Sequence, residues 1–120
     1  MRRILLGLAL AASLSAPVLA HPKLLGASPA ADTTVTTAPR TLVLNFSEKL
    51  IAPMSGAELT MIMPGMAGHA IPVKTSVGAD GRSLVLVPAS PLPRGQYQVD
   101  WHVVSADTHR ITGSYKIQVG

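Results

Sequence analysis

The segment QYQVDWHV, residues 96–103, decides the fold class of this chain. Because successive side chains of a β-strand point to opposite sides, strict alternation of polar and apolar residues predicts a strand with one face in a core. His102 alternates out of phase with the apolar residues, so it is expected to face solvent. The apolar residues that share the predicted inward face are Tyr97, Val99, Trp101 and Val103.

Other short segments also have strand character, and turns rich in Gly and Pro separate them. Residues 83–87 are continuous and apolar, as a buried strand would be. Residues 29–39 are polar and rich in Thr, so they predict a connection. About seven strands in about 100 residues, with no helical periodicity, predict an all-β, immunoglobulin-like sandwich or barrel. The remaining expected strands are 23–28, 41–47, 57–63, 71–77 and 111–119.

The first twenty residues have the features of a removable export signal. A basic start at residues 1–3 precedes an apolar run at 4–14, and the small residues Val18 and Ala20 follow. This order is typical of a secretory signal peptide. Cleavage after Ala20 would leave an exported domain of residues 21–120.

The composition excludes several classes of function. Without Arg2 and Arg3 the formal net charge of +4 falls to about +2, and the remaining basic residues are scattered, so nucleic acid is not an expected partner. The absence of Cys excludes disulfides and thiolate metal sites. No later segment approaches the ~20 apolar residues of a membrane-spanning helix. Aromatic residues are too few to favour a platform that stacks sugars or bases.

His21 would become the N-terminal residue after cleavage. Its α-amine and imidazole Nδ1 could then chelate one metal ion. Pro22 has no backbone N–H, which excludes a square-planar site built from deprotonated backbone amides at that position. Other ligands must therefore come from elsewhere in the fold. The competing interpretation is that a His after the cleavage site is a coincidence.

Asp107 and His109 are the best candidates for those other ligands. In an extended segment, residues i and i+2 point to the same side, so the carboxylate and the imidazole can converge. With His21 they form a set of three nitrogens and one oxygen, which suits tetragonal Cu(II). The alternative is an Asp that caps a turn beside a solvated His. Glu48 follows a predicted strand and is a weaker candidate, for which an ordinary surface carboxylate is the expected role.

Four of the five Met residues lie between positions 54 and 66, and His69 follows them. Thioethers are soft ligands that select Cu(I). The competing interpretation is core packing by flexible Met side chains. Core packing is the expected role of Met54. For Met61, core packing and copper binding are equally supported. It explains Met63 and Met66 less well, because residues 64–69 read as a Gly- and Pro-containing loop.

Several segments of the chain resemble the CopC family of periplasmic copper-resistance proteins, and the resemblance spans essentially the whole of residues 21–120. The most specific segment is DWHVVSADTH, residues 100–109, whereas the Met segment varies within the family. The other similar segments are HPKL at 21–24, LNFSE at 44–48, residues 61–69 with their Met and His residues, and PASPL at 88–92.

The resemblance implies a Greek-key β-barrel that carries copper without catalysis, and it implies a location in a bacterial periplasm. It implies a Cu(II) site and a separate Cu(I) site in the Met loop. Family members with a full Cu(I) loop have another Met shortly after the His, where this chain has Ala70-Ile71-Pro72. The implied ligands are His21, Asp107 and His109 for Cu(II), and Met61, Met63, Met66 and His69 for Cu(I).

The expected function is therefore a non-enzymatic copper-binding protein of copper resistance, which sequesters copper or transfers it. Expected partners are copper ions and other copper-resistance proteins, such as a membrane copper importer or a multicopper oxidase. An alternative is a copper oxygenase of polysaccharides, which is similar only in its N-terminal His. A third interpretation, a metal-free adhesion or chaperone sandwich, leaves the clustered Met and His residues unexplained.

Overall fold

The computed structural model describes residues 21–120, and the expected signal peptide at residues 1–20 lies outside them. Within the described part, no helix is long and apolar enough to cross a membrane. The elements of this part are β1 Leu24–Ser28, β2 Thr33–Val35, β3 Leu42–Phe46, the 3-10 helix η1 Ala52–Met54, β4 Gly56–Ile62, β5 His69–Ile71, β6 Val73–Val77, β7 Ser83–Pro88, β8 Gly95–Val104 and β9 Arg110–Val119.

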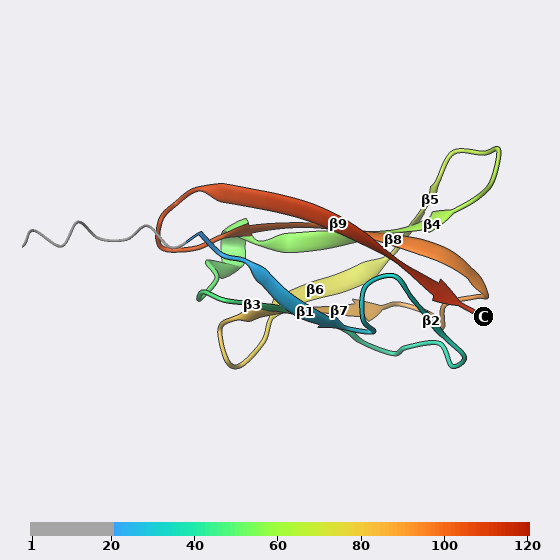
Figure 1. Cartoon of the computed structure of the whole chain (residues 1–120), viewed down its shortest axis with the longest axis horizontal. Coiled ribbons are helices and arrows are strands. Elements are labelled where there is room, and N and C mark those ends of the chain that lie inside the picture. The colour runs from blue at the N-terminus through green and yellow to red at the C-terminus, as the bar shows by residue number, and fades with distance from the viewer. Residues whose placement is uncertain (1–20) are drawn as a thin grey trace, which may run out of the picture.

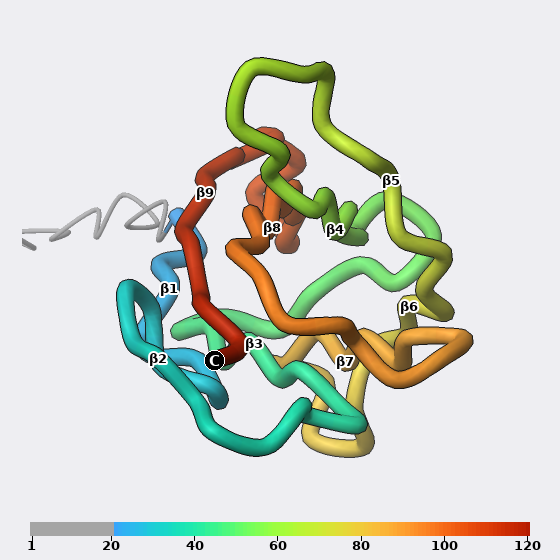
Figure 2. Tube along the Cα trace, turned by 90° about the vertical axis from the view of Figure 1, so that its right-hand side faces the viewer, coloured from blue at the N-terminus to red at the C-terminus, as the bar shows by residue number. Residues whose placement is uncertain are grey.

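The strands form two sheets that pack face to face (Figures 1 and 2). One sheet has the order β1-β3-β7-β6 and the other the order β2-β9-β8-β4-β5. Neighbours pair antiparallel, except that β2 runs parallel to the end of β9. The expectation of an all-β sandwich is therefore confirmed.

The core lies between the two sheets, and β8 supplies one of its largest faces. As the alternation predicts, Tyr97, Val99, Trp101 and Val103 are all buried. Phe46 of β3 meets Trp101 from the opposite sheet, edge to face, with 5.1 Å between ring centroids. Each fully buried side chain of this size stabilises the fold by about 1.5–3 kcal/mol, so this contact surface holds the sheets together.

Two expectations about strand number are wrong. The Thr-rich connection contains β2, a strand too short to show alternation, which pairs with β9 at Thr33 and Ile117. The segment 71–77, expected as one strand, is divided at Pro72. Proline cannot donate to a ladder, and there the chain passes from β5 in the five-stranded sheet to β6 in the four-stranded sheet. His69, expected in a loop, begins β5.

The expectation that residues 83–87 form a buried strand is confirmed on one face only. Leu84 and Leu86 are buried, whereas Val85 is half-buried and Val87 is 43% exposed. The physical reason is that the sandwich has only two layers, so the outer face of β7 has no layer to cover it. Continuous apolar character alone does not distinguish this arrangement from a fully buried strand.

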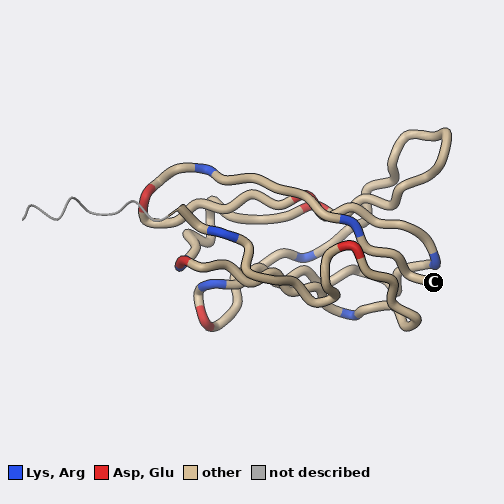
Figure 3. Tube along the Cα trace, viewed as in Figure 1, with Lys and Arg blue, Asp and Glu red and all other residues tan. Residues whose placement is uncertain are grey.

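Charged residues are spread over the strands and loops of both sheets (Figure 3). The connection between β8 and β9 lies at one end of the sandwich, close to the start of the described chain. The loop between β4 and β5 projects from the other end (Figure 1). The candidate ligands of the sequence therefore divide between two ends of one domain.

Candidate metal centre

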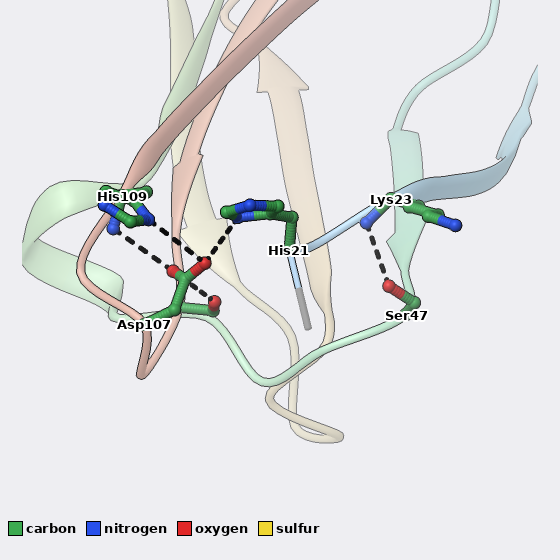
Figure 4. A network of polar contacts seen from close by, with 6 residues as sticks. His21, Lys23, Ser47, Asp107 and His109 are labelled. Atoms are coloured by element: carbon green, nitrogen blue, oxygen red, sulfur yellow. Dashed lines mark hydrogen bonds and ion pairs between the residues drawn. The ribbon is translucent and has the colours of Figure 1, made fainter. Parts of the chain in front are cut away.

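The segment before β1 is fixed to the sandwich by a buried residue and a pair of hydrogen bonds. Pro22 is fully buried. The Lys23 N–H donates to Ser47 Oγ at 2.9 Å, and the Ser47 N–H donates to the Lys23 carbonyl at 2.9 Å (Figure 4). The Arg82 guanidinium donates to the Ser47 carbonyl at 3.1 Å. His21 is thus held at the end of the sandwich even though its own side chain is exposed.

The turn between β8 and β9 orients Asp107 and His109. The Thr108 N–H donates to the Ser105 carbonyl at 2.9 Å, and Thr108 has a φ of 64°. A β-branched residue rarely adopts this left-handed conformation, so the turn holds Thr108 against its own preference. The Ser105 hydroxyl and the His109 N–H donate to Asp107 Oδ1, at 3.0 and 3.1 Å. The interpretation of Asp107 as a turn-capping residue is therefore correct for one of its oxygens.

The other oxygen of Asp107 faces both candidate His residues. His21 Nδ1 lies 2.7 Å from Asp107 Oδ2, and His109 Nδ1 lies 3.7 Å from the same oxygen (Figure 4). The ligand atoms of the three residues all lie within 4.8 Å of one another. We call this group, His21, Asp107 and His109, the His end. The structure therefore brings together the three residues that the sequence analysis selected for Cu(II).

The surroundings of Asp107 favour the ionised form of its carboxyl. Its side chain is only 3% exposed, and this burial acts to raise the pKa of Asp107. Hydrogen bonds from the Ser105 hydroxyl, the His21 ring and the His109 backbone outweigh the burial, so that the pKa of Asp107 is below its usual value. The carboxylate is consequently ionised at neutral pH, as a metal ligand must be.

Two other residues weighed as ligands do not join this group. Glu48 is half-buried in the loop after β3 and is not among the three converging residues. His102 lies on the outer face of the five-stranded sheet, opposite Gly56 of β4. Its ring covers Gly56 so closely that a Cβ added to this glycine would lie 3.2 Å from His102 Cε1. It lines a shallow polar hollow with Glu58 and Arg110. The position of His102 outside the core agrees with the prediction from the alternation of polar and apolar residues along β8.

Three Met residues and His69 lie at the opposite end of the sandwich, whereas Met54 lies in η1, beside the end of β4 that pairs with His102. Met61 of β4 is directly across from His69 of β5, and Met61 also packs against the core. Met63 follows β4 and is half-buried, and its carbonyl accepts the Met66 N–H at 3.1 Å. Met66 is 73% exposed in the loop. We call this group, Met61, Met63, Met66 and His69, the Met end.

Met61 packs within the sandwich and also lies opposite His69. The Cε methyl of Met61 lies against Gly95. A Cβ added at Gly95 would lie only 2.6 Å from this methyl, and Gly95 has a φ of 153°, so both the space and the backbone favour glycine here. Met61 therefore packs and still lies beside His69. The expectation for Met54 is wrong, because this residue is 53% exposed in η1 rather than packed in the core.

Three supporting residues were missed by sequence reasoning: Pro22 as a buried anchor, Ser47 as its clamp and Ser105 as a donor to Asp107. Ser105 precedes Asp107 by two residues, and short-range bonds between Ser or Asp side chains and nearby groups are frequent in turns. That signal could have identified Ser105. The contact of Ser47 with Lys23 spans 24 residues, and no local pattern reveals it.

A family model for the CopC domain matches residues 24–120. The chain belongs to the CopC family. The match covers nearly all of the described residues, so the resemblance read from the sequence is confirmed. It starts after His21, so His21 lies outside the matched residues, whereas Asp107 and His109 lie within them.

Individual proteins support the same assignment. Copper resistance protein C of Escherichia coli is 47% identical over 117 residues, which cover 94% of this chain and 90% of that protein. The crystal structure of PcoC, a methionine-rich copper resistance protein from Escherichia coli, matches with a TM-score of 0.79 and 47% identity over 84% of this chain and 100% of that one. CopC from Methylosinus trichosporium OB3b matches with a TM-score of 0.72 and 28% identity, over 82% and 93% of the two chains.

Proposed function

We propose that this CopC protein binds copper in a bacterial periplasm and sequesters it or transfers it without catalysis. The observation that carries the proposal is the convergence of His21, Asp107 and His109 within 4.8 Å. Relatives named as copper resistance proteins support copper as the metal. Cleavage after Ala20 is part of the proposal, because it exposes the amine of His21.

Cu(II) is the ion that the His end fits best. Two imidazoles, one carboxylate oxygen and the α-amine of a processed His21 form a set of three nitrogens and one oxygen, which suits tetragonal Cu(II). The ionised state of Asp107 supplies one negative charge at the site. Copper would replace the proton that now links His21 Nδ1 to Asp107 Oδ2.

Cu(I) is the ion that the Met end would take. Thioether sulfur is a soft ligand, and three Met residues with His69 provide a mixed sulfur and nitrogen set. The exposure of Met66 supports this proposal, since a side chain that is 73% exposed contributes little to packing. His69 lies opposite Met61, so these two residues would form the fixed part of the site.

Binding is favoured over polysaccharide oxidation. All four aromatic residues, Phe46, Tyr97, Trp101 and Tyr115, are buried, so none is available on the surface to stack sugar rings. Four protein donors at the His end would also leave little of a tetragonal copper open to oxygen. Partners of transfer would be other copper-resistance proteins, such as a membrane importer or a multicopper oxidase.

The proposal can be tested on protein purified from the periplasm. N-terminal sequencing should begin at His21, and the protein should hold one Cu(II) under oxidising conditions and one Cu(I) under reducing conditions. The copper-loaded protein should not oxidise polysaccharides in the presence of a reductant. A correctly processed protein that binds no Cu(II) would show that the function proposed for the His end is wrong.

A further inference from the structure

The two oxygens of Asp107 have different surroundings. Oδ1 accepts two hydrogen bonds from the protein, one from the Ser105 hydroxyl at 3.0 Å and one from the His109 N–H at 3.1 Å. Among the described residues 21–120, the polar partners of Oδ2 are the two candidate His rings, with His21 Nδ1 at 2.7 Å and His109 Nδ1 at 3.7 Å. The protein thus occupies one oxygen of this carboxylate and leaves the other for a ligand.

We propose that Ser105 is a positioning residue that makes Asp107 a one-oxygen ligand, which binds copper through Oδ2 alone. The inference rests on the proposed Cu(II) function of the His end and adds how its carboxylate is presented. If the metal took both oxygens, Oδ1 would have to turn away from its two donors. The Ser105 hydroxyl, on a residue that is only 3% exposed, would then lose its acceptor, which is costly where water has little access. The His109 N–H would lose the same acceptor at an exposed position.

Ser105 itself has little freedom to move. The residue is only 3% exposed, and its carbonyl accepts the Thr108 N–H at 2.9 Å. The same turn places the His109 N–H on Asp107 Oδ1, so backbone and hydroxyl act on one atom (Figure 4). Partners of this kind, behind the direct ligands, fix the orientation of metal ligands and commonly contribute 10–100-fold to affinity.

Three variants separate positioning from general stability. Ser105→Ala removes the hydroxyl, and Ser105→Thr keeps a hydroxyl at the same position. Ser55→Ala is the matched control, because Ser55 Oγ also bonds at the end of β8. It accepts the Val104 N–H at 3.1 Å and donates to the Val104 carbonyl at 3.4 Å, and these are its side-chain bonds among the described residues. Cu(II) affinity, the EPR spectrum of the copper form and the melting temperature of the metal-free form are measured for each.

Ser105→Ala should lower Cu(II) affinity at least tenfold, on the scale of changes behind direct ligands, and should alter the EPR spectrum. Ser105→Thr should recover the native affinity and spectrum. Ser55→Ala should lower the melting temperature while leaving both copper properties native. Infrared spectra of native protein with isotope-labelled Asp give a test that needs no variant. The wide separation of carboxylate stretching bands that one-oxygen binding produces should be present.

The idea is overturned if Ser105→Ala binds Cu(II) within twofold of native with the native spectrum. It is also overturned if Ser55→Ala lowers affinity as much as Ser105→Ala, or if the infrared bands are those of a two-oxygen carboxylate. His109→Ala distinguishes this failure from failure of the proposed function. Loss of Cu(II) in His109→Ala with no effect of Ser105→Ala would reject the positioning role alone.

Discussion

The two ends of the sandwich hold their candidate ligands in different ways. At the His end, Asp107 is held through Oδ1 by two hydrogen bonds, and the chain at His21 is anchored by buried Pro22. At the Met end, Met61 and His69 are held by strand pairing, whereas Met66 is exposed in a loop. The difference suits the two ions, since Cu(II) favours a defined tetragonal set and flexible thioethers can adapt to Cu(I).

The largest effect should come from adding one residue before His21. A Met at this position converts the α-amine to an amide and removes both a ligand and the chelate ring. Cu(II) affinity should fall by about 100-fold or more, which corresponds to ~2.8 kcal/mol, while Cu(I) affinity stays native. Copper EPR and competition titrations measure both. Equal EPR spectra for the extended and native forms would show that the α-amine of His21 is not a Cu(II) ligand.

Replacing His109 by Ala should have the next largest effect. It deletes one imidazole from the His end, so Cu(II) affinity should fall by about 10–100-fold or more. His102→Ala is the matched control, because His102 lies on the outer face of the five-stranded sheet and outside the His end. It should change Cu(II) affinity by less than about twofold. Isothermal titration or competition with a Cu(II) chelator gives the two values. The reverse ranking would place His102, not His109, in the site.

The double variant Met63→Leu/Met66→Leu tests the Met end with little change in volume or apolarity. Cu(I) affinity should fall by roughly tenfold, about 1.4 kcal/mol, because Met61 and His69 remain as a weakened site. Cu(II) affinity should stay native, since the His end is untouched. A Cu(I) chelator competition provides the measurement. Native Cu(I) affinity in the folded variant would show that Met63 and Met66 do not bind Cu(I) and serve in packing.

Ser47→Ala should have the smallest effect on metal binding. It removes the acceptor of the Lys23 N–H, a bond whose net value is about 0.5–1.5 kcal/mol. Cu(II) affinity should fall a few-fold because the chain at His21 is held less tightly. Thr33→Ala, which removes the Thr33 hydroxyl bond to the Ala30 carbonyl, is the control. Equal losses of affinity in both variants would show that the Ser47 clamp has no specific role.

The sequence predicts the structure well where the environment of a residue depends on residues close to it in the sequence. The inward face of β8 follows from alternation. Asp107 and His109 converge as predicted, but they do so in a turn with Thr108 at a φ of 64°, not in the extended segment that the prediction assumed. The division of 71–77 at Pro72 and the exposure of Val87 depend on which sheet each segment joins. The clamp between Lys23 and Ser47 likewise joins distant segments. Such long-range arrangements leave no periodic signal in a single sequence.

Strand β8 connects the two ends of the sandwich. It begins at Gly95, against which Met61 packs, and ends at Val104, just before Ser105. Ten residues of strand rise roughly 33 Å, whereas the Debye length in physiological salt is about 8 Å. The charge of an ion bound at one end would therefore be screened before it reached the other. Loading of one end should not repel an ion from the other, so each ion would be bound and released according to its own supply.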